Sequence, residues 1–82
     1  MNVLQYRYKR PVMTDKQTRE IGKRMKQHRL QAGLSQAGLA EISGMNTNAY
    51  AKIERGENEP TLGTIKKLSK ALGVKASDIL GY

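Results

Sequence analysis

Residues 34–56 read LSQAGLAEISGMNTNAYAKIERG, and this stretch decides the fold. It divides at Gly44 into two short helical patterns, and each follows a residue type that caps helix N-termini well, Ser35 and Asn46. A glycine in the connecting turn accepts the positive φ that other residues rarely adopt. Two short helices joined by a tight turn cannot lie antiparallel and both reach one core. The stretch therefore predicts two helices that cross at a steep angle.

Three further helical patterns flank this pair. One helix is expected from Thr14 to Gly33, and a short one opens near Ala76 or Ser77. The remaining helix has apolar residues at spacings of three and four, and they are Leu62, Ile65, Leu68 and Leu72. The sequence thus predicts an all-α domain of five short helices over residues 14–82.

The first residues follow a different pattern. Residues 3–10, VLQYRYKR, alternate apolar and polar side chains with a period of two, which is typical of a strand, and Pro11 ends the alternation. A lone strand is not stable in water. Residues 1–13 are therefore expected to form either a disordered basic arm or a strand that pairs with another chain.

Charge indicates an anionic partner. The chain has 15 Lys and Arg against 7 Asp and Glu, a net charge of +8. Most of this excess lies in residues 1–34, whereas residues 35–55 carry equal numbers of acidic and basic side chains. A basic balance suits nucleic acid or an anionic membrane surface, and a merely solvated basic surface is the alternative.

Several classes of protein are excluded by composition. The absence of cysteine removes disulfides and thiolate metal sites, and the single His28 has no second imidazole with which to bind a metal. No apolar run approaches the roughly 20 residues that span a bilayer, and no apolar segment follows the basic N-terminus. We expect a cytoplasmic protein without membrane insertion, metal, cofactor or catalytic site.

The run from Ile21 to Leu80 resembles the helix-turn-helix domain of the Cro and lambdoid-repressor family, often called the XRE-type family. The matching motifs, in order, are LSQ at 34–36, LA at 39–40, KIERG at 52–56, Pro60 and LGV at 72–74. The resemblance implies a lambda-repressor-like domain whose third helix enters the DNA major groove, usually as a dimer on a palindromic operator.

The resemblance also assigns roles by position. It places Gln36 against a phosphate at the start of the second helix and implies a structural ion pair between Arg29 and Glu54. The residues that it turns toward DNA are Asn46, Thr47, Asn48, Lys52 and Arg55.

The chemistry of these side chains agrees with DNA reading. An amide presents a donor beside an acceptor and so matches the N6 and N7 edge of adenine, whereas Arg or Lys matches guanine. Asn48 is the expected base reader, Thr47 can meet a phosphate or a thymine methyl, and Asn46 is expected mainly to cap the third helix. Candidate phosphate contacts are Lys16, Arg19, Lys23 and the arm residues Arg7, Lys9 and Arg10.

The helix pair departs from the family pattern at several positions. Ala37 and Gly38 replace a pair of Glu residues found in many members, and Thr47 replaces a common Gln or Arg. Gly38 lies inside the second helix, where glycine costs about 1 kcal/mol relative to alanine. Tyr50 replaces a branched aliphatic residue, so its hydroxyl needs a partner or solvent. These departures bear on the DNA sequence that is recognised and leave the expected fold unchanged.

The leading hypothesis is a sequence-specific regulator, a repressor or controller protein, that binds double-stranded DNA as a homodimer. The alternative is an antitoxin or protein-interaction module whose main partner is a toxin or another protein. An enzyme is not expected, because Glu54 has no second acid, base or metal with which to form a catalytic site.

Overall fold

The computed structural model describes residues 13–82, and the elements of this part are five helices. They are α2 (Asp15–Gln31), α3 (Gln36–Ile42), α4 (Thr47–Glu54), α5 (Leu62–Leu72) and α6 (Ala76–Leu80). The expected all-α fold of five helices is confirmed over these residues. The possible strand at residues 3–10 lies outside the described residues.

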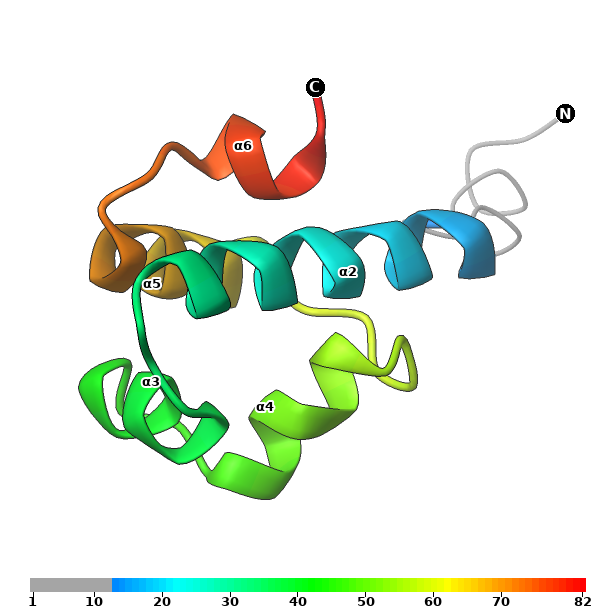
Figure 1. Cartoon of the computed structure of the whole chain (residues 1–82). Helices are drawn as coiled ribbons and strands as arrows, with labels where there is room; N and C mark the ends of the chain where they lie inside the picture. The colour runs from blue at the N-terminus through cyan, green and yellow to red at the C-terminus, as the bar shows by residue number, and fades with distance from the viewer. Residues whose placement is uncertain (1–12) are drawn as a thin grey trace, which may run out of the picture.

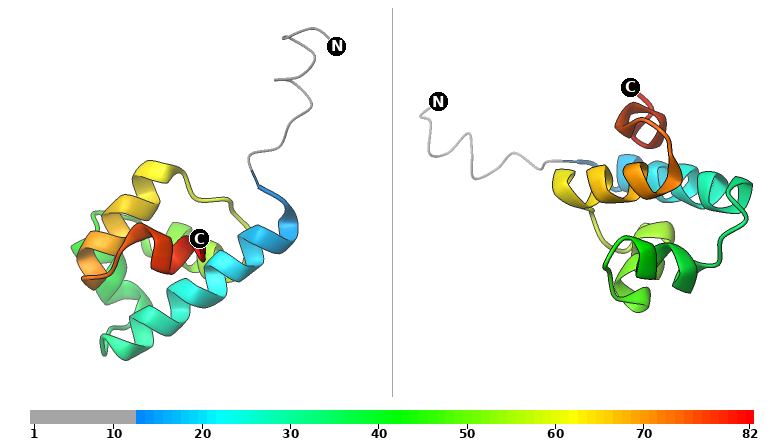
Figure 2. Two further views of the ribbon diagram at one scale, coloured as in Figure 1. Left: turned by 90° about the horizontal axis from the view of Figure 1, so that it is seen from above. Right: turned by 90° about the vertical axis from the view of Figure 1, so that its left-hand side faces the viewer.

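The helices are arranged on three levels (Figure 1). α2 and α5 occupy the middle level, α6 packs against both from one side, and α3 and α4 lie on the opposite side. The right-hand view of Figure 2 shows the same order from the end of the molecule. α4 therefore has the body of the domain on one side and solvent on the other.

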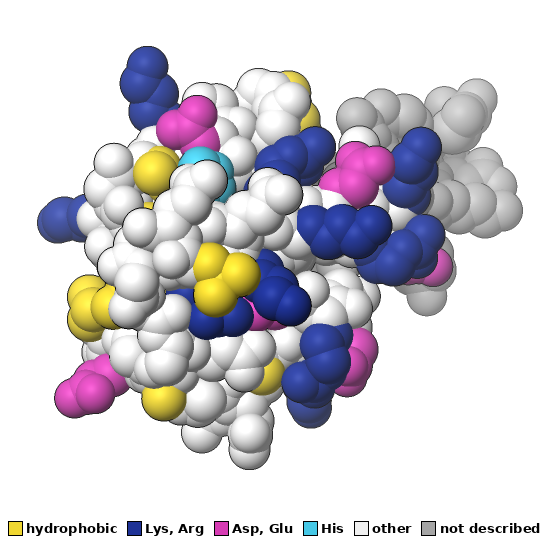
Figure 3. Space-filling view, in the orientation of Figure 1, with side chains coloured by type: hydrophobic (Ala, Val, Ile, Leu, Met, Phe, Trp, Pro, Cys, Tyr) yellow, Lys and Arg dark blue, Asp and Glu magenta, His cyan; other side chains and the backbone are white. Residues whose placement is uncertain are grey.

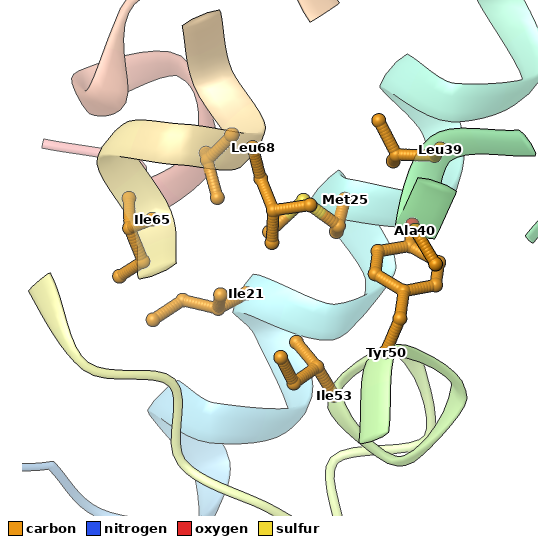
Figure 4. Packing of buried hydrophobic residues seen from close by; sticks show 9 residues of the cluster. Ile21, Met25, Leu39, Ala40, Tyr50, Ile53, Ile65 and Leu68 are labelled. Atoms are coloured by element: carbon orange, nitrogen blue, oxygen red, sulfur yellow. The ribbon is translucent and has the colours of Figure 1, made fainter. Parts of the chain in front are cut away.

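Apolar side chains from all five helices form one buried cluster, and Figure 4 labels those of α2, α3, α4 and α5. The buried cluster consists of Ile21, Met25, Leu39, Ala40, Tyr50, Ile53, Ile65, Leu68 and Ile79. Leu62 shares the apolar spacing of α5 but lies outside this cluster, since 58% of the residue is exposed. Leu62 is the first residue of α5 and lies one turn before Ile65, where the buried face of the helix begins.

Side-chain caps and one glycine turn set the crossing of α3 and α4. The Ser35 hydroxyl accepts the backbone N–H of Gly38 at 2.9 Å and so begins α3. Gly44 has a φ of +69°, and the N–H of Met45 donates to the carbonyl oxygen of Ala40 at 2.8 Å. This closing turn satisfies the last carbonyls of α3 and lets α4 start in a new direction within a few residues.

α2 and α4 touch at the backbone. A Cβ atom placed on Gly22 would lie 2.5 Å from the carbonyl oxygens of Ile53 and Glu54, far inside van der Waals contact. Only glycine permits this close approach, although glycine inside a helix costs about 1 kcal/mol relative to alanine. The crossing therefore brings the C-terminal end of α4 onto α2 and leaves its N-terminal end pointing away (Figure 1).

One carboxylate then joins α2, α3 and α4. Glu54 accepts hydrogen bonds from Arg29, Nε to Oε2 at 2.6 Å and Nη2 to Oε1 at 3.2 Å. Gln36 Nε2 donates to Oε1 at 3.0 Å, and the Tyr50 hydroxyl donates to Oε2. Arg29 Nη1 also donates to the carbonyl oxygen of Leu34 at 2.9 Å. The side chains of Arg29 and Glu54 are only 9% and 4% exposed, so this is a buried ion pair that fixes α4 against its neighbours.

Burial and hydrogen bonding act on Glu54 in opposite directions. Burial alone raises the pKa of Glu54, but the hydrogen bonds from Arg29, Tyr50 and Gln36 favour the carboxylate and bring the pKa below its ordinary value of 4.5. Burial, and then the bond to Glu54, raises the pKa of Tyr50, which keeps its hydroxyl protonated as a donor. The Tyr50 hydroxyl thus has the partner that its position requires.

We predict that Gly22→Ala lowers the free energy of unfolding by about 1 to 3 kcal/mol, because the new methyl group collides with rigid backbone. Urea unfolding followed by circular dichroism measures the change. Gly63→Ala in α5 is the matched control, since its Cβ would lie 3.8 Å from the Thr61 hydroxyl, an ordinary contact. Gly63→Ala should be neutral or stabilising, and equal losses in the two variants would contradict the close approach.

We also predict that stability falls in acid through Glu54. Because the folded-state pKa is lowered, the unfolded chain binds the proton more readily, so stability is full above pH 4.5 and is lost as pH drops through the folded-state pKa. Urea unfolding from pH 7 to pH 3 measures the loss.

The Glu54→Gln variant removes the titrating group and should lose less of its remaining stability over this pH range than the unmodified protein. Should Glu54→Gln not fold, Tyr50→Phe replaces it. The loss of one donor to the carboxylate should move the acid transition to higher pH. If the variant shows the same pH dependence of stability as the unmodified protein, the loss of stability in acid does not come from Glu54.

Candidate nucleic-acid interface

α4 combines buried apolar side chains with exposed polar ones. The buried residues are Tyr50, Ala51 and Ile53. The exposed residues are Asn46, Thr47, Asn48, Lys52 and Arg55, the set that the sequence directed toward DNA. The N-terminal end of the helix points away from α2 (Figure 1), so the short polar side chains there are open to a partner.

Asn46 is occupied by its own helix. Its Oδ1 accepts the backbone N–H groups of Asn48 at 2.9 Å and of Ala49 at 3.2 Å, which makes it the N-cap of α4. Thr47 and Asn48 follow it in the first turn, and both are exposed. Asn46 thus orients the end of the helix, and Thr47 and Asn48 are the side chains that this end presents.

Ser35 and Gln36 lie at the start of α3, and both are engaged within the protein. The Ser35 hydroxyl caps α3, and the half-buried Gln36 donates to Glu54. A primary amide has two N–H donors and a carbonyl acceptor, so Gln36 keeps hydrogen-bonding capacity beyond this bond. The carboxylate of Glu54 only accepts, and it therefore fixes which end of the Gln36 amide points inward.

Arg19 and Lys23 lie on the exposed side of α2, one helical turn apart. A Cβ atom on Gly56 would be 3.0 Å from the Cα of Arg19, so this part of α2 borders the end of α4. Figure 3 shows Lys and Arg side chains gathered over α2, whereas the surface over α3 and the start of α4 is mainly uncharged. Charge and uncharged polar groups are thus separated on one face.

Arg55 has a partner that the sequence analysis missed. Its Nε donates to the Glu57 carboxylate, and Nη2 lies 3.5 Å from Glu57 Oε1. The hydrogen bond from Arg55 lowers the pKa of Glu57, so the carboxylate is charged at neutral pH. The sequence did offer a signal for this pair. Glu57 follows Arg55 by two residues, directly after the glycine that ends the helix.

The structure also bears on other kinds of site. Within residues 13–82, no group of three or more His, Asp or Glu side chains is placed to hold a metal ion. Among the described helices, none has the length and apolar character needed to cross a bilayer.

Known proteins resemble this chain over its helical part. The sequence model of the HTH_3 helix-turn-helix family matches residues 25–79. The HTH-type transcriptional regulator PuuR of Escherichia coli is 40% identical over 57 residues, which are 70% of this chain and 31% of that protein. The control protein C.BamHI of Bacillus amyloliquefaciens is 36% identical over 63 residues, 76% of this chain and 78% of that protein.

A solved structure shows the same fold. The crystal structure of the restriction-modification controller protein C.AhdI from Aeromonas hydrophila superposes with a TM-score of 0.74 at 32% identity, covering 76% of this chain and 94% of that one. The chain spans about a third of PuuR but most of the two controller proteins. The family match, the identities and the superposition together show that this chain belongs to the HTH_3, or XRE-type, helix-turn-helix family.

Proposed function

We propose that this protein is a sequence-specific DNA-binding transcriptional regulator, a repressor or controller protein, that binds palindromic duplex DNA as a homodimer. The observation that carries the proposal is the construction of α4. Its inner side is locked by the buried pair of Arg29 and Glu54, and its outer side presents exposed amide and hydroxyl groups at a free helix end.

α4 enters the major groove in this proposal. The groove is about 12 Å wide and admits one α-helix, and its base edges present donors and acceptors that amides can match. Asn48 reads a base and Thr47 meets a phosphate or a thymine methyl, while Lys52 and Arg55 extend the contact along the helix. Because the bonds of Glu54 to Arg29 and Gln36 hold α4 against α2 and α3, these side chains meet the DNA in one defined orientation.

The basic side chains of α2 anchor the complex. Arg19 and Lys23 neutralise phosphates beside the groove, and such contacts position a protein without reading the sequence. The separation of charge from uncharged polar groups in Figure 3 supports this division between anchoring and reading.

Two copies of the chain are needed for a specific site. One recognition helix brings only a few side chains to base edges, so a single copy distinguishes few base pairs. A second copy related by a two-fold axis repeats the contact on an inverted half-site about one helical turn, roughly 34 Å, away.

Selection of bound sequences from random duplex DNA tests the proposal. We predict enrichment of an inverted repeat whose half-site centres are about 10 base pairs or a multiple apart. Recovery of no preferred sequence would overturn the proposal and favour a protein-interaction module, with a toxin or another protein as the partner.

We further predict that Asn48→Ala and Lys23→Ala act differently on the selected site. Asn48→Ala should change which base is preferred at one position of each half-site, because it removes a reader. Lys23→Ala should weaken binding to all sequences alike and reduce the salt dependence by about 0.9 logarithmic units for each lost phosphate contact. Fluorescence anisotropy with a panel of single-base variants of the site, at several salt concentrations, separates the two. The same sequence-independent loss in both variants would contradict the assignment.

A further inference from the structure

Glu57 is held firmly at the end of α4. Gly56 has a φ of +75°, and the backbone N–H of Glu57 donates to the carbonyl oxygen of Lys52 at 2.9 Å, which closes the last turn of the helix. A Cβ on Gly56 would lie 2.7 Å from the Cγ of Arg19, so this turn also packs onto α2. The backbone that carries Glu57 is therefore part of the rigid scaffold that carries α4.

The Glu57 carboxylate meets one edge of the Arg55 guanidinium. A guanidinium has five N–H donors arranged in a plane, and the edge formed by Nε and Nη2 faces Glu57. The adjacent edge, formed by Nη1 and Nη2, keeps two parallel donors. The Arg55 and Glu57 side chains are 55% and 51% exposed, so a partner can approach this second edge without displacing the carboxylate.

We propose that Glu57 is a positioning residue for specificity, which holds Arg55 so that its second edge donates to the O6 and N7 atoms of a guanine. This inference rests on the proposed function, because it requires α4 to lie in the major groove. Paired acceptors at this spacing are the group that the free edge of an arginine matches best among base edges. A side chain fixed in advance loses less conformational freedom on binding and tolerates a displaced base less well.

Charge cancellation separates Arg55 from the anchoring side chains. An arginine that faces a carboxylate carries little net charge toward the phosphates, so it adds little to the salt-dependent attraction that all DNA sequences share. Its donors remain, and they distinguish guanine from the other bases. Glu57 therefore converts a general phosphate-binding side chain into one that discriminates between sequences.

The experiment compares Glu57→Gln with Glu59→Gln. Both variants remove one exposed carboxylate from the same loop, but the structure pairs Glu57 with Arg55 and gives no such bond to Glu59 among the described residues. Site selection with Arg55→Gln first identifies the guanine whose preference depends on Arg55. Dissociation constants are then measured for the selected site, for the site with that guanine replaced, and for random duplex DNA at several salt concentrations.

We expect Glu57→Gln to reduce the discrimination against the replaced guanine by about fivefold or more, the scale of one bidentate base contact. Binding to random DNA should tighten and become steeper in salt, by up to about 0.9 logarithmic units, because Arg55 regains its free charge. Glu59→Gln should leave the discrimination unchanged. Once Arg55 is replaced by glutamine, adding Glu57→Gln should have no further effect on discrimination, as a coupled pair requires.

Other results would overturn the inference. Discrimination equal to that of the unmodified protein, or a uniform weakening on every sequence, would show that Glu57 does not orient a base contact. A loss of unfolding free energy in Glu57→Gln large enough to unfold the protein would assign Glu57 a structural role instead. If the unmodified protein selects no sequence, the proposed function itself fails; if it selects a site and Glu57→Gln behaves like Glu59→Gln, only this inference fails.

Discussion

The buried carboxylate of Glu54 is the constraint on which the domain depends. A charge inside a protein is tolerated only when it is paired and its remaining lone pairs are hydrogen-bonded, and Arg29, Gln36 and Tyr50 meet this requirement together. Each of the three donors reaches Glu54 from its own direction, and they come from α2, α3 and α4. A displacement of any one of these helices would leave part of the carboxylate unsatisfied. The network thus specifies one relative position of the three helices more sharply than apolar packing alone does.

The apolar core and the backbone contact at Gly22 complete this arrangement. The core joins all five helices, but a flexible side chain such as Met25 can adapt to small shifts between them. The contact between Gly22 and the carbonyls of Ile53 and Glu54 does not, because backbone atoms cannot rotate away from one another. It lies directly beside the buried ion pair. Steric exclusion and charge pairing therefore act on the same end of α4.

Much of the fold could be predicted from the sequence, because its signals are local. Caps such as Ser35 and Asn46, the glycine turn at Gly44 and the apolar spacing within helices each act over a few residues, and the structure has the corresponding elements. Contacts between distant residues carry no such local signal, and the pair of Arg29 and Glu54 was implied only by the resemblance to a family. From the sequence, Gly22 is only a residue that lowers helix stability, and its role appears when α4 packs against it. The bond from Gln36 to Glu54 joins residues 18 positions apart.

The candidate site divides in the same way. The exposure of Asn48 and Lys52 follows from helical periodicity once Tyr50 and Ile53 are buried, and this could be predicted. The pairing of Arg55 with Glu57 depends on how the chain turns after the helix, and the sequence analysis did not anticipate it. Leu62 shows that spacing alone does not fix burial, since it fits the apolar pattern of α5 but the core does not extend to the start of that helix.

The outward direction of the first turn of α4 has a consequence for how such a protein can change. Thr47 and Asn48 take no part in the core or in the Glu54 network, so their replacement leaves the scaffold intact. Natural variation or laboratory evolution can therefore replace these two side chains while the architecture stays constant, and under the proposed function such a replacement changes the DNA sequence that is bound. The surface that would contact a partner can thus change in sequence, because the apolar core and the Glu54 network maintain stability without it.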